Sequence, residues 1–133
     1  MSKFNKQSVS EFYAEHQGKP FFDNLCNFMC SDVTVGMELI ASDAVAKWRK
    51  TIGPTNSDNA KRDAPGSIRA KFGTDGTRNA AHGADSAVSH KRESEFWFGG
   101  EVPADRPMQT TAVMDNCTLC LIKPHVLREG MAG

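Results

Sequence analysis

The sequence predicts an α+β fold, in which helices flank a small β-sheet. Residues 20–29 and 42–52 place apolar side chains at helical spacing. Residues 34–40 and 117–122 are short apolar segments with β-branched side chains, as is typical of buried strands. The length of 133 residues, of which 39% are hydrophobic and 24% charged, is that of one globular domain.

The first two helices are expected near the N-terminus. Residues 8–11 have the pattern of a capping box, which would begin a short helix containing Phe12 and Tyr13. Pro20 suits the first turn of the next helix, because a helix leaves the N–H groups of its first turn unpaired.

Two more helices are expected after the strand at 34–40. Asp43 would cap a helix that carries Trp48 and Ile52 on one face. Asp85 or Ser86 would cap a helix running to the aromatic residues at 96–98.

Between these elements the apolar periodicity is lost. Residues 53–76 are rich in Gly, Pro, Asn and Asp, which predicts a long loop with one helical turn near residues 67–70. Residues 79–83 are expected to form a short strand or turn, and residues 99–116 a linker. Long loops within compact domains are usually functional or disordered, so residues 53–76 are a candidate part of the site.

Charge and hydropathy exclude several classes of partner. Sixteen Lys and Arg balance sixteen Asp and Glu, so no global field favours nucleic acid or an anionic membrane. The chain has no run of 18 apolar residues and its first segment lacks a signal-peptide core. We therefore expect a soluble, cytoplasmic protein that binds neither nucleic acid nor membranes.

The four cysteines raise the question of a metal site. Cys117 and Cys120 form a C-x-x-C motif, but residues three apart on a strand point to opposite faces. Cys26 and Cys30 share one face of the predicted helix. We expect buried, reduced thiols and no metal ligands, with a small zinc module as the less favoured alternative.

His82 is the first candidate for chemistry. It precedes a predicted helix start, where free N–H groups favour negative charge, and Glu93 lies eleven positions on, within reach of its ring through the tertiary structure. On these residues alone, an ordinary turn histidine is the more common interpretation.

Three further residues suit phosphate. Arg49 falls on the side of its helix that faces the core, where it must extend to solvent or face a cleft. Arg69 and Thr55 place a guanidinium and a hydroxyl in the long loop. The alternative is that both arginines are simply solvated.

The segment GPTNSDNAKRDAPGSIRAKFGTDGTRNAAHGADS, residues 53–86, resembles the signature of nucleoside diphosphate kinases. PGSIR, followed by RN-x-x-HG and then D-S, is a specific pattern. The similarity also includes YAEHQGKPFFDNLCNFM and ESEFWF, and it extends over residues 1–98. It implies an α+β fold with a ferredoxin-like antiparallel sheet and flanking helices.

The resemblance also implies an activity: transfer of the γ-phosphate of a nucleoside triphosphate, such as ATP, to a diphosphate through phosphohistidine, with Mg²⁺ on the nucleotide. It assigns His82 as nucleophile, Glu93 as the acid that orients it, Tyr13 as its neighbour, Phe21 as the base-stacking aromatic, Arg49, Thr55 and Arg69 as phosphate ligands, and Asn79 as a ribose and phosphate ligand. These types fit phosphoryl transfer, which depends on positioning and charge neutralisation.

The sequence departs from the family pattern in several places. Ala84 replaces a serine, Gly76 replaces an aliphatic residue over the base, and the loop before Pro65 is a few residues longer. The first strand of the family, with its lysine, is missing at the N-terminus. Residues 117–125, CTLCLIKPH, match that first strand, with His125 in place of an aspartate and Lys123 as the phosphate-binding lysine.

This arrangement resembles family members with two kinase domains in tandem, which are associated with ciliary axonemes and microtubule-organising complexes. It predicts a kinase domain lacking its first strand at 1–98, a linker at 99–116, and the opening strand of a second kinase domain at 117–133. A non-catalytic axonemal or microtubule-associated scaffold that retains the nucleotide pocket is the alternative function, with a cilium or cytoskeleton location.

The strand at 117–122 has the right sequence for the vacant position in the sheet. An 18-residue linker can cross a domain of this size, since each extended residue spans about 3.3–3.6 Å. We therefore expect the strand to fold back, giving a circularly permuted domain in which Lys123 lies beside His82.

Overall fold

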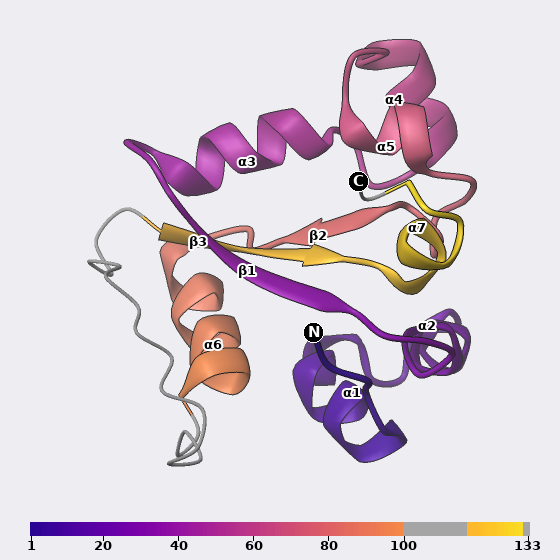
Figure 1. Cartoon of the computed structure of the whole chain (residues 1–133), viewed down its shortest axis with the longest axis vertical. Coiled ribbons are helices and arrows are strands. Elements are labelled where there is room, and N and C mark those ends of the chain that lie inside the picture. The colour runs from indigo at the N-terminus through magenta and orange to yellow at the C-terminus, as the bar shows by residue number, and fades with distance from the viewer. Residues whose placement is uncertain (100–116, 132–133) are drawn as a thin grey trace.

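The α+β prediction is confirmed by a computed structural model, which describes residues 1–99 and 117–131. In these residues, three strands form an antiparallel sheet of order β1-β3-β2 (Figure 1). The strands are β1 Val35–Ile40, β2 Ala81–Gly83 and β3 Cys117–Ile122. The expected strand positions are therefore correct.

The central strand is β3, although it comes last in the chain. It pairs with β1 over its full length, with Val35 opposite Ile122 and Ile40 opposite Cys117. On its other edge it pairs with β2, where His82 is opposite Leu121. The expected return of residues 117–122 into the sheet is thus confirmed.

Helices cover both faces of the sheet. Figure 1 shows α3 on one face and α6 on the other, with α1 and α2 on the same side of the sheet as α6 and with α4 and α5 beyond the end of α3. The bounds are α1 Lys6–Phe12, α2 Phe22–Met29, α3 Ala44–Ile52, α4 Ser57–Asp63, α5 Ile68–Phe72, α6 Ala87–Phe98 and α7 Pro124–Arg128, with a short 3-10 helix at Ala14–His16.

Two glycines bring α3 and α6 close to the sheet. A Cβ on Gly36 of β1 would lie 2.6 Å from Cε3 of Trp97 of α6, and a Cβ on Gly83 of β2 would lie 2.4 Å from Cδ1 of Trp48 of α3. Each indole therefore lies directly on the strand backbone. This packing fixes α6 and α3 on opposite faces of β3.

The main hydrophobic core lies between the sheet and the helices α1, α2 and α6. Leu119 and Leu121 of β3 are fully buried in it, together with Val9 of α1 and Met29 of α2. Because side chains alternate along a strand, His82 lies on the same face as Leu121. The hydrophobic core therefore packs against the face of the sheet that carries the His82 side chain.

Local details differ from expectation at the helix starts. The capping box is formed by Asn5 and Ser8, so α1 begins three residues earlier than the pattern at 8–11 predicted. Asp43 is the N-cap of α3, but its backbone is left-handed, with φ of 53°, and its side chain caps nothing. Ser86 caps α6 as expected.

Two short helices were not predicted. The long loop 53–76 contains α4, whose side chains are polar apart from Ala60, so it shows no apolar period. The α4 helix is instead held by Asn56, whose Oδ1 accepts from the N–H groups of Asp58 and Asn59. The tail beyond β3 forms α7.

The predicted linker 99–116 lies outside the described residues except for Gly99. Among the residues that are described, no helix has both the length and the apolar character needed to cross a membrane.

Candidate functional site

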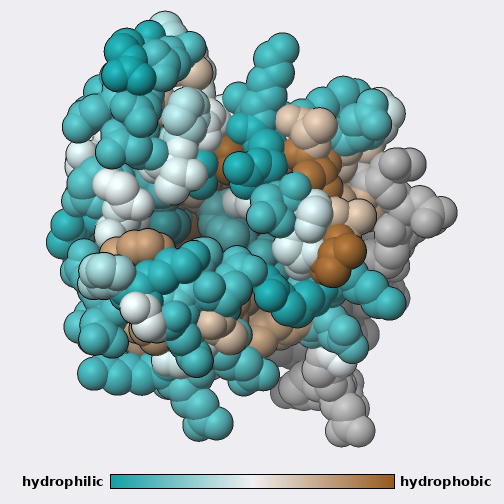
Figure 2. Space-filling view, turned by 180° about the vertical axis from the view of Figure 1, so that it is seen from behind, coloured by the Kyte–Doolittle hydropathy of each residue, from teal (hydrophilic) through white to brown (hydrophobic). Residues whose placement is uncertain are grey.

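A cavity of about 590 Å³ opens at the end of β2 and β3. Its lining includes all nine residues singled out from the sequence: Tyr13, Phe21, Arg49, Thr55, Arg69, Asn79, His82, Glu93 and Lys123. They come from α3, α5, α6 and β2 and from the segments between elements. Figure 2 shows a hollow near the centre of one face, surrounded mainly by hydrophilic residues.

His82 is held by a carboxylate. Its Nε2 lies 2.8 Å from Oε2 of Glu93, whose side chain is only 4% exposed. An ionised carboxylate accepts hydrogen bonds only, so this contact places the imidazole proton on Nε2. The Nδ1 atom then carries the lone pair of the neutral ring.

The ring and backbone of His82 are also fixed by packing. The rings of Phe12 and Tyr13 lie edge-on to the imidazole, with centroids 5.6 and 5.9 Å away. Trp48 Nε1 donates to the backbone oxygen of His82 at 3.2 Å. Sequence reasoning missed this role of Phe12 and Trp48, because their spacing shows only that they face a core.

Arg69 is a buried cation at the base of the cavity. Its Nη1 donates to the oxygen of Gly53 at 2.8 Å and its Nη2 to the oxygen of Ala81 at 3.0 Å. Burial, followed by the nearby Arg49 guanidinium, lowers the pKa of Arg69 to about 10. Its Nε has no hydrogen-bond partner among the described residues.

Arg49 reaches the same cavity from α3. Its Nη1 lies 3.5 Å from the oxygen of Gly83, which is a long hydrogen bond. Within the part of the chain that is described, neither Arg49, Arg69 nor Lys123 forms an ion pair. Among the described residues, these three basic groups of the cavity are therefore not held in direct ion pairs by its carboxylates, Glu15, Asp75, Asp85 and Glu93, and they are available to bind an anionic ligand.

Lys123 enters the cavity from the end of β3. Its side chain is buried, and its Nζ donates to the oxygen of Thr77 at 3.0 Å. Burial, and next the charge of Arg69, lowers the pKa of Lys123 to about 7. A bound anion would oppose both effects and raise that pKa.

Polar atoms without partners border the cavity. Asn79 donates through Nδ2 to the oxygens of Thr55 and Gly76, but its buried Oδ1 has no partner among the described residues. The buried hydroxyl of Tyr13 is also unpaired there, and burial raises its pKa. Such groups are costly unless a ligand or water pairs them.

The rim of the cavity is open where a planar ring would fit. Phe21 is 45% exposed, and a Cβ added at Gly76 would meet nothing within 4 Å. Thr55 is also exposed at the entrance. Ala84, by contrast, is fully buried and does not line the cavity.

Comparison with known proteins gives the site a context. The family model described as "Nucleoside diphosphate kinase" matches residues 1–102. The Mus musculus protein "Nucleoside diphosphate kinase homolog 7" is 44% identical over 136 residues, which cover the whole of this chain and 33% of that relative. The chain thus spans about a third of the length of this relative.

Solved structures of similar fold belong to the same family. The nucleoside diphosphate kinase of Aquifex aeolicus has a TM-score of 0.66 and 38% identity, over 74% of this chain and 70% of that one. That of Halobacterium salinarum, in complex with CDP, has a TM-score of 0.56 and 28% identity, over 79% of this chain and 70% of that one.

Proposed function

Because the chain belongs to the nucleoside diphosphate kinase family, we propose that it transfers the γ-phosphate of a nucleoside triphosphate to a nucleoside diphosphate through phosphohistidine at His82. The observation that supports this most strongly is the contact between His82 Nε2 and Glu93 Oε2 at 2.8 Å. It leaves Nδ1 with a lone pair for which no hydrogen bond is found among the described residues.

In the first half-reaction, Nδ1 of His82 attacks the γ-phosphorus. The N–P bond forms as the bond between that phosphorus and the β,γ-bridging oxygen breaks, and the electron pair leaves with the diphosphate. Positive charge develops on the imidazole, which keeps its Nε2 proton. The Glu93 carboxylate stabilises this charge by accepting the hydrogen bond from Nε2–H. The second half-reaction reverses these steps with a different diphosphate.

The cations of the cavity neutralise the phosphates. Arg49 and Arg69 supply guanidinium groups that bind phosphate oxygens in forked geometry, and Lys123 supplies a point charge. The unpaired Oδ1 of Asn79 accepts a hydrogen bond from a ribose hydroxyl, and Thr55 donates to a phosphate oxygen. These assignments remain proposals that rest on position in one cavity.

The nucleotide brings its own metal ion. Among the described residues, the His, Cys, Asp and Glu side chains of this cavity form no group of three that could hold a metal ion. Mg²⁺ is usually bound through phosphate oxygens, so in this proposal it enters as MgATP, as part of the substrate. The base stacks on Phe21 at the open rim, and the CDP complex of the Halobacterium salinarum relative supports a nucleoside phosphate as ligand.

The domain boundaries 1–98, 99–116 and 117–133, including a second kinase domain that begins at 117, stay a prediction about a longer protein. So do microtubule or axonemal partners, a cilium or cytoskeleton location and the non-catalytic scaffold. The cavity favours the kinase, because a scaffold has no need for three basic side chains around an oriented histidine.

Phosphate exchange between MgATP and GDP tests this function. Wild-type protein should convert GDP to GTP, and His82→Ala should lose this activity by several orders of magnitude. His16→Ala is the matched control, since His16 borders the same cavity without a carboxylate hydrogen bond to hold one tautomer. Exchange by His82→Ala above a trace would refute the assignment.

A further inference from the structure

We propose that Glu38, His90 and Cys117 form a zinc site that joins three elements of the fold. Their ligand atoms all lie within 4.8 Å of one another. Glu38 comes from β1, His90 from α6 and Cys117 from the start of β3. The site is separate from His82 and does not depend on the proposed kinase activity.

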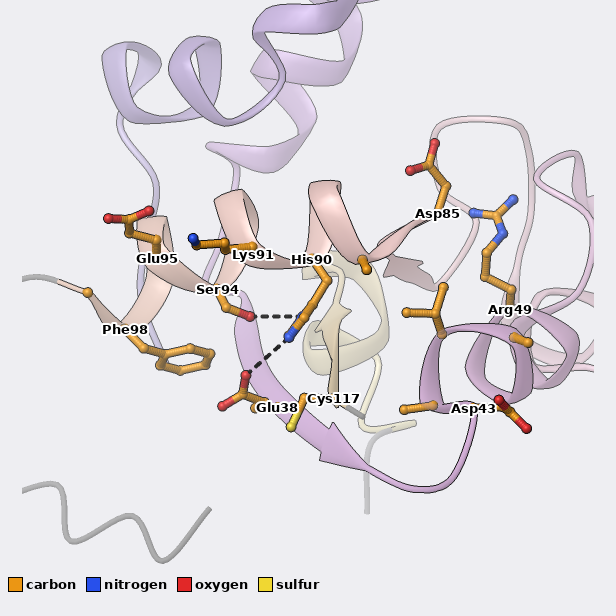
Figure 3. Close-up of a pocket in the computed structure, with 15 residues that line it drawn as sticks. Glu38, Asp43, Arg49, Asp85, His90, Lys91, Ser94, Glu95, Phe98 and Cys117 are labelled. Atoms are coloured by element: carbon orange, nitrogen blue, oxygen red, sulfur yellow. Dashed lines mark hydrogen bonds and ion pairs between the residues drawn. The ribbon is translucent and has the colours of Figure 1, made fainter. Parts of the chain in front are cut away.

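The three side chains converge at the wall of a second cavity. Figure 3 shows them pointing toward one another from β1, α6 and β3. This cavity measures about 870 Å³, and Glu38, His90, Ser94 and Cys117 all line it. A metal ion therefore has a route of entry, and the cavity provides room for a water molecule as fourth ligand.

The Glu38 carboxylate meets the His90 imidazole at ion-pair distance but not at hydrogen-bond distance. Its side chain is 11% exposed, and its Oε1 is buried without a hydrogen bond to any described residue. His90 Nε2 is 3.6 Å from this oxygen, which is too far for a hydrogen bond. A buried carboxylate oxygen without a hydrogen bond is unfavourable. A cation bound between Glu38 Oε1 and His90 Nε2 removes that cost.

Ser94 orients the imidazole for this purpose. The His90 Nδ1 atom lies 3.1 Å from the Ser94 hydroxyl, one helical turn further along α6. When Nδ1–H donates to this hydroxyl, Nε2 carries a lone pair and faces Glu38. Metal-binding histidines are commonly fixed in this way by a hydrogen bond to the other ring nitrogen.

The donor set selects the ion. A thiolate, an imidazole nitrogen and a carboxylate oxygen suit Zn²⁺, whereas Mg²⁺ prefers oxygen ligands and keeps its water. Zinc bonds of about 2.0–2.3 Å bring the donor atoms of a tetrahedral site to roughly 3.3–3.8 Å apart. The atoms of this cluster reach that geometry with small side-chain movements, and the Cys117 thiol loses its proton on binding.

A zinc ion at this site would act as a clamp, a cross-link that joins the central strand to two other elements. Cys117 is the first residue of β3, and the ion would tie it to β1 and to α6. His90 is three positions before Glu93 on the same helix, so the clamp also restrains the element that orients His82. Zinc binding should therefore stabilise the folded chain.

The test uses tag-free protein, stripped with a chelator and titrated with Zn²⁺, Co²⁺ or Mg²⁺ in the absence of nucleotide. We expect one equivalent of Zn²⁺, no Mg²⁺, and a thiolate-to-cobalt charge-transfer band with Co²⁺. Free Zn²⁺ at about a hundred times the Kd should raise Tm by roughly 5–10 °C.

Variants assign the ligands. Cys117→Ser should lose the charge-transfer band, and His90→Gln and Glu38→Gln should weaken zinc binding by about 10–100-fold. Cys30→Ser, which changes a half-buried thiol outside the cluster, should bind like the wild type. If the variants fail to fold, the cobalt spectrum of the wild type shows by its charge-transfer band whether a thiolate binds the ion. Absence of stoichiometric zinc, or cobalt binding without a thiolate band, overturns the proposal.

Discussion

Nζ of Lys123 donates a hydrogen bond of 3.0 Å to the backbone oxygen of Thr77, although the two residues are 46 positions apart. The contact exists because β3 lies between β1 and β2, so the end of β3 delivers Lys123 into the cavity that contains His82. Strand order and the charge of the site are therefore linked.

The lowered pKa of Lys123 predicts proton uptake on nucleotide binding. With a pKa of about 7 in the free protein, Lys123 is mainly neutral at pH 8. Bound phosphates raise the pKa toward its ordinary value, so binding at pH 8 should take up about 0.9 proton. Calorimetry in buffers of different ionisation enthalpy measures this number. Lys123→Met should abolish the uptake, and an unchanged value in that variant would contradict the assignment.

Glu93→Gln should slow phosphorylation of His82 more than it weakens nucleotide binding. The amide can donate to Nε2 and so favour the tautomer with a proton on Nδ1, which cannot attack phosphorus. We expect phosphoenzyme formation to slow by about 10–1000-fold. Rapid-quench kinetics with labelled ATP gives the rate, and Glu95→Gln, an exposed change on the same helix, should leave it unchanged. Equal rates for Glu93→Gln and the wild type would refute this role.

Arg69→Met should weaken ATP binding by roughly 10–100-fold, because it removes a buried guanidinium from a site with few other cations. The matched control is Arg62→Met, since Arg62 is exposed on α4 and pairs with the neighbouring Asp63. Binding can be followed by titration calorimetry of MgATP. Similar affinities for the two variants would show that Arg69 has a structural role only.

Gly36→Ala should destabilise the fold by about 1–3 kcal/mol, because the new Cβ would overlap the Trp97 ring. Gly66→Ala is the control, as nothing lies within 4 Å of a Cβ at that position. Urea unfolding of both variants gives the comparison. Equal midpoints would show that Trp97 can move away from β1 without cost.

Much of this architecture was accessible from the sequence. β1 and β3 were predicted because buried strands have short apolar patterns, whereas the cavity residues were assigned from the resemblance to the nucleoside diphosphate kinase family. In contrast, α4 has one apolar residue and depends on the side chain of Asn56, a tertiary detail that periodicity does not reveal.

Contacts between elements that are far apart in the sequence could not be predicted either. The sequence predicts Trp48 only as a core residue, yet its Nε1 also donates a hydrogen bond to the backbone oxygen of His82. Glu38, His90 and Cys117 share no sequence spacing, and only the pairing of β1 with β3 under α6 brings them together. The expectation that Cys117 binds no metal considered cysteine pairs alone, and the proposed zinc site at this cluster departs from it.

The most direct measurement is the site of phosphorylation after brief incubation with γ-labelled MgATP. The account predicts one acid-labile, alkali-stable phosphate per chain, mapped by mass spectrometry to His82 and lost on addition of an unlabelled nucleoside diphosphate. His82→Ala should carry no label. Absence of label on the folded wild-type chain, or label on another residue such as His16, would contradict the account.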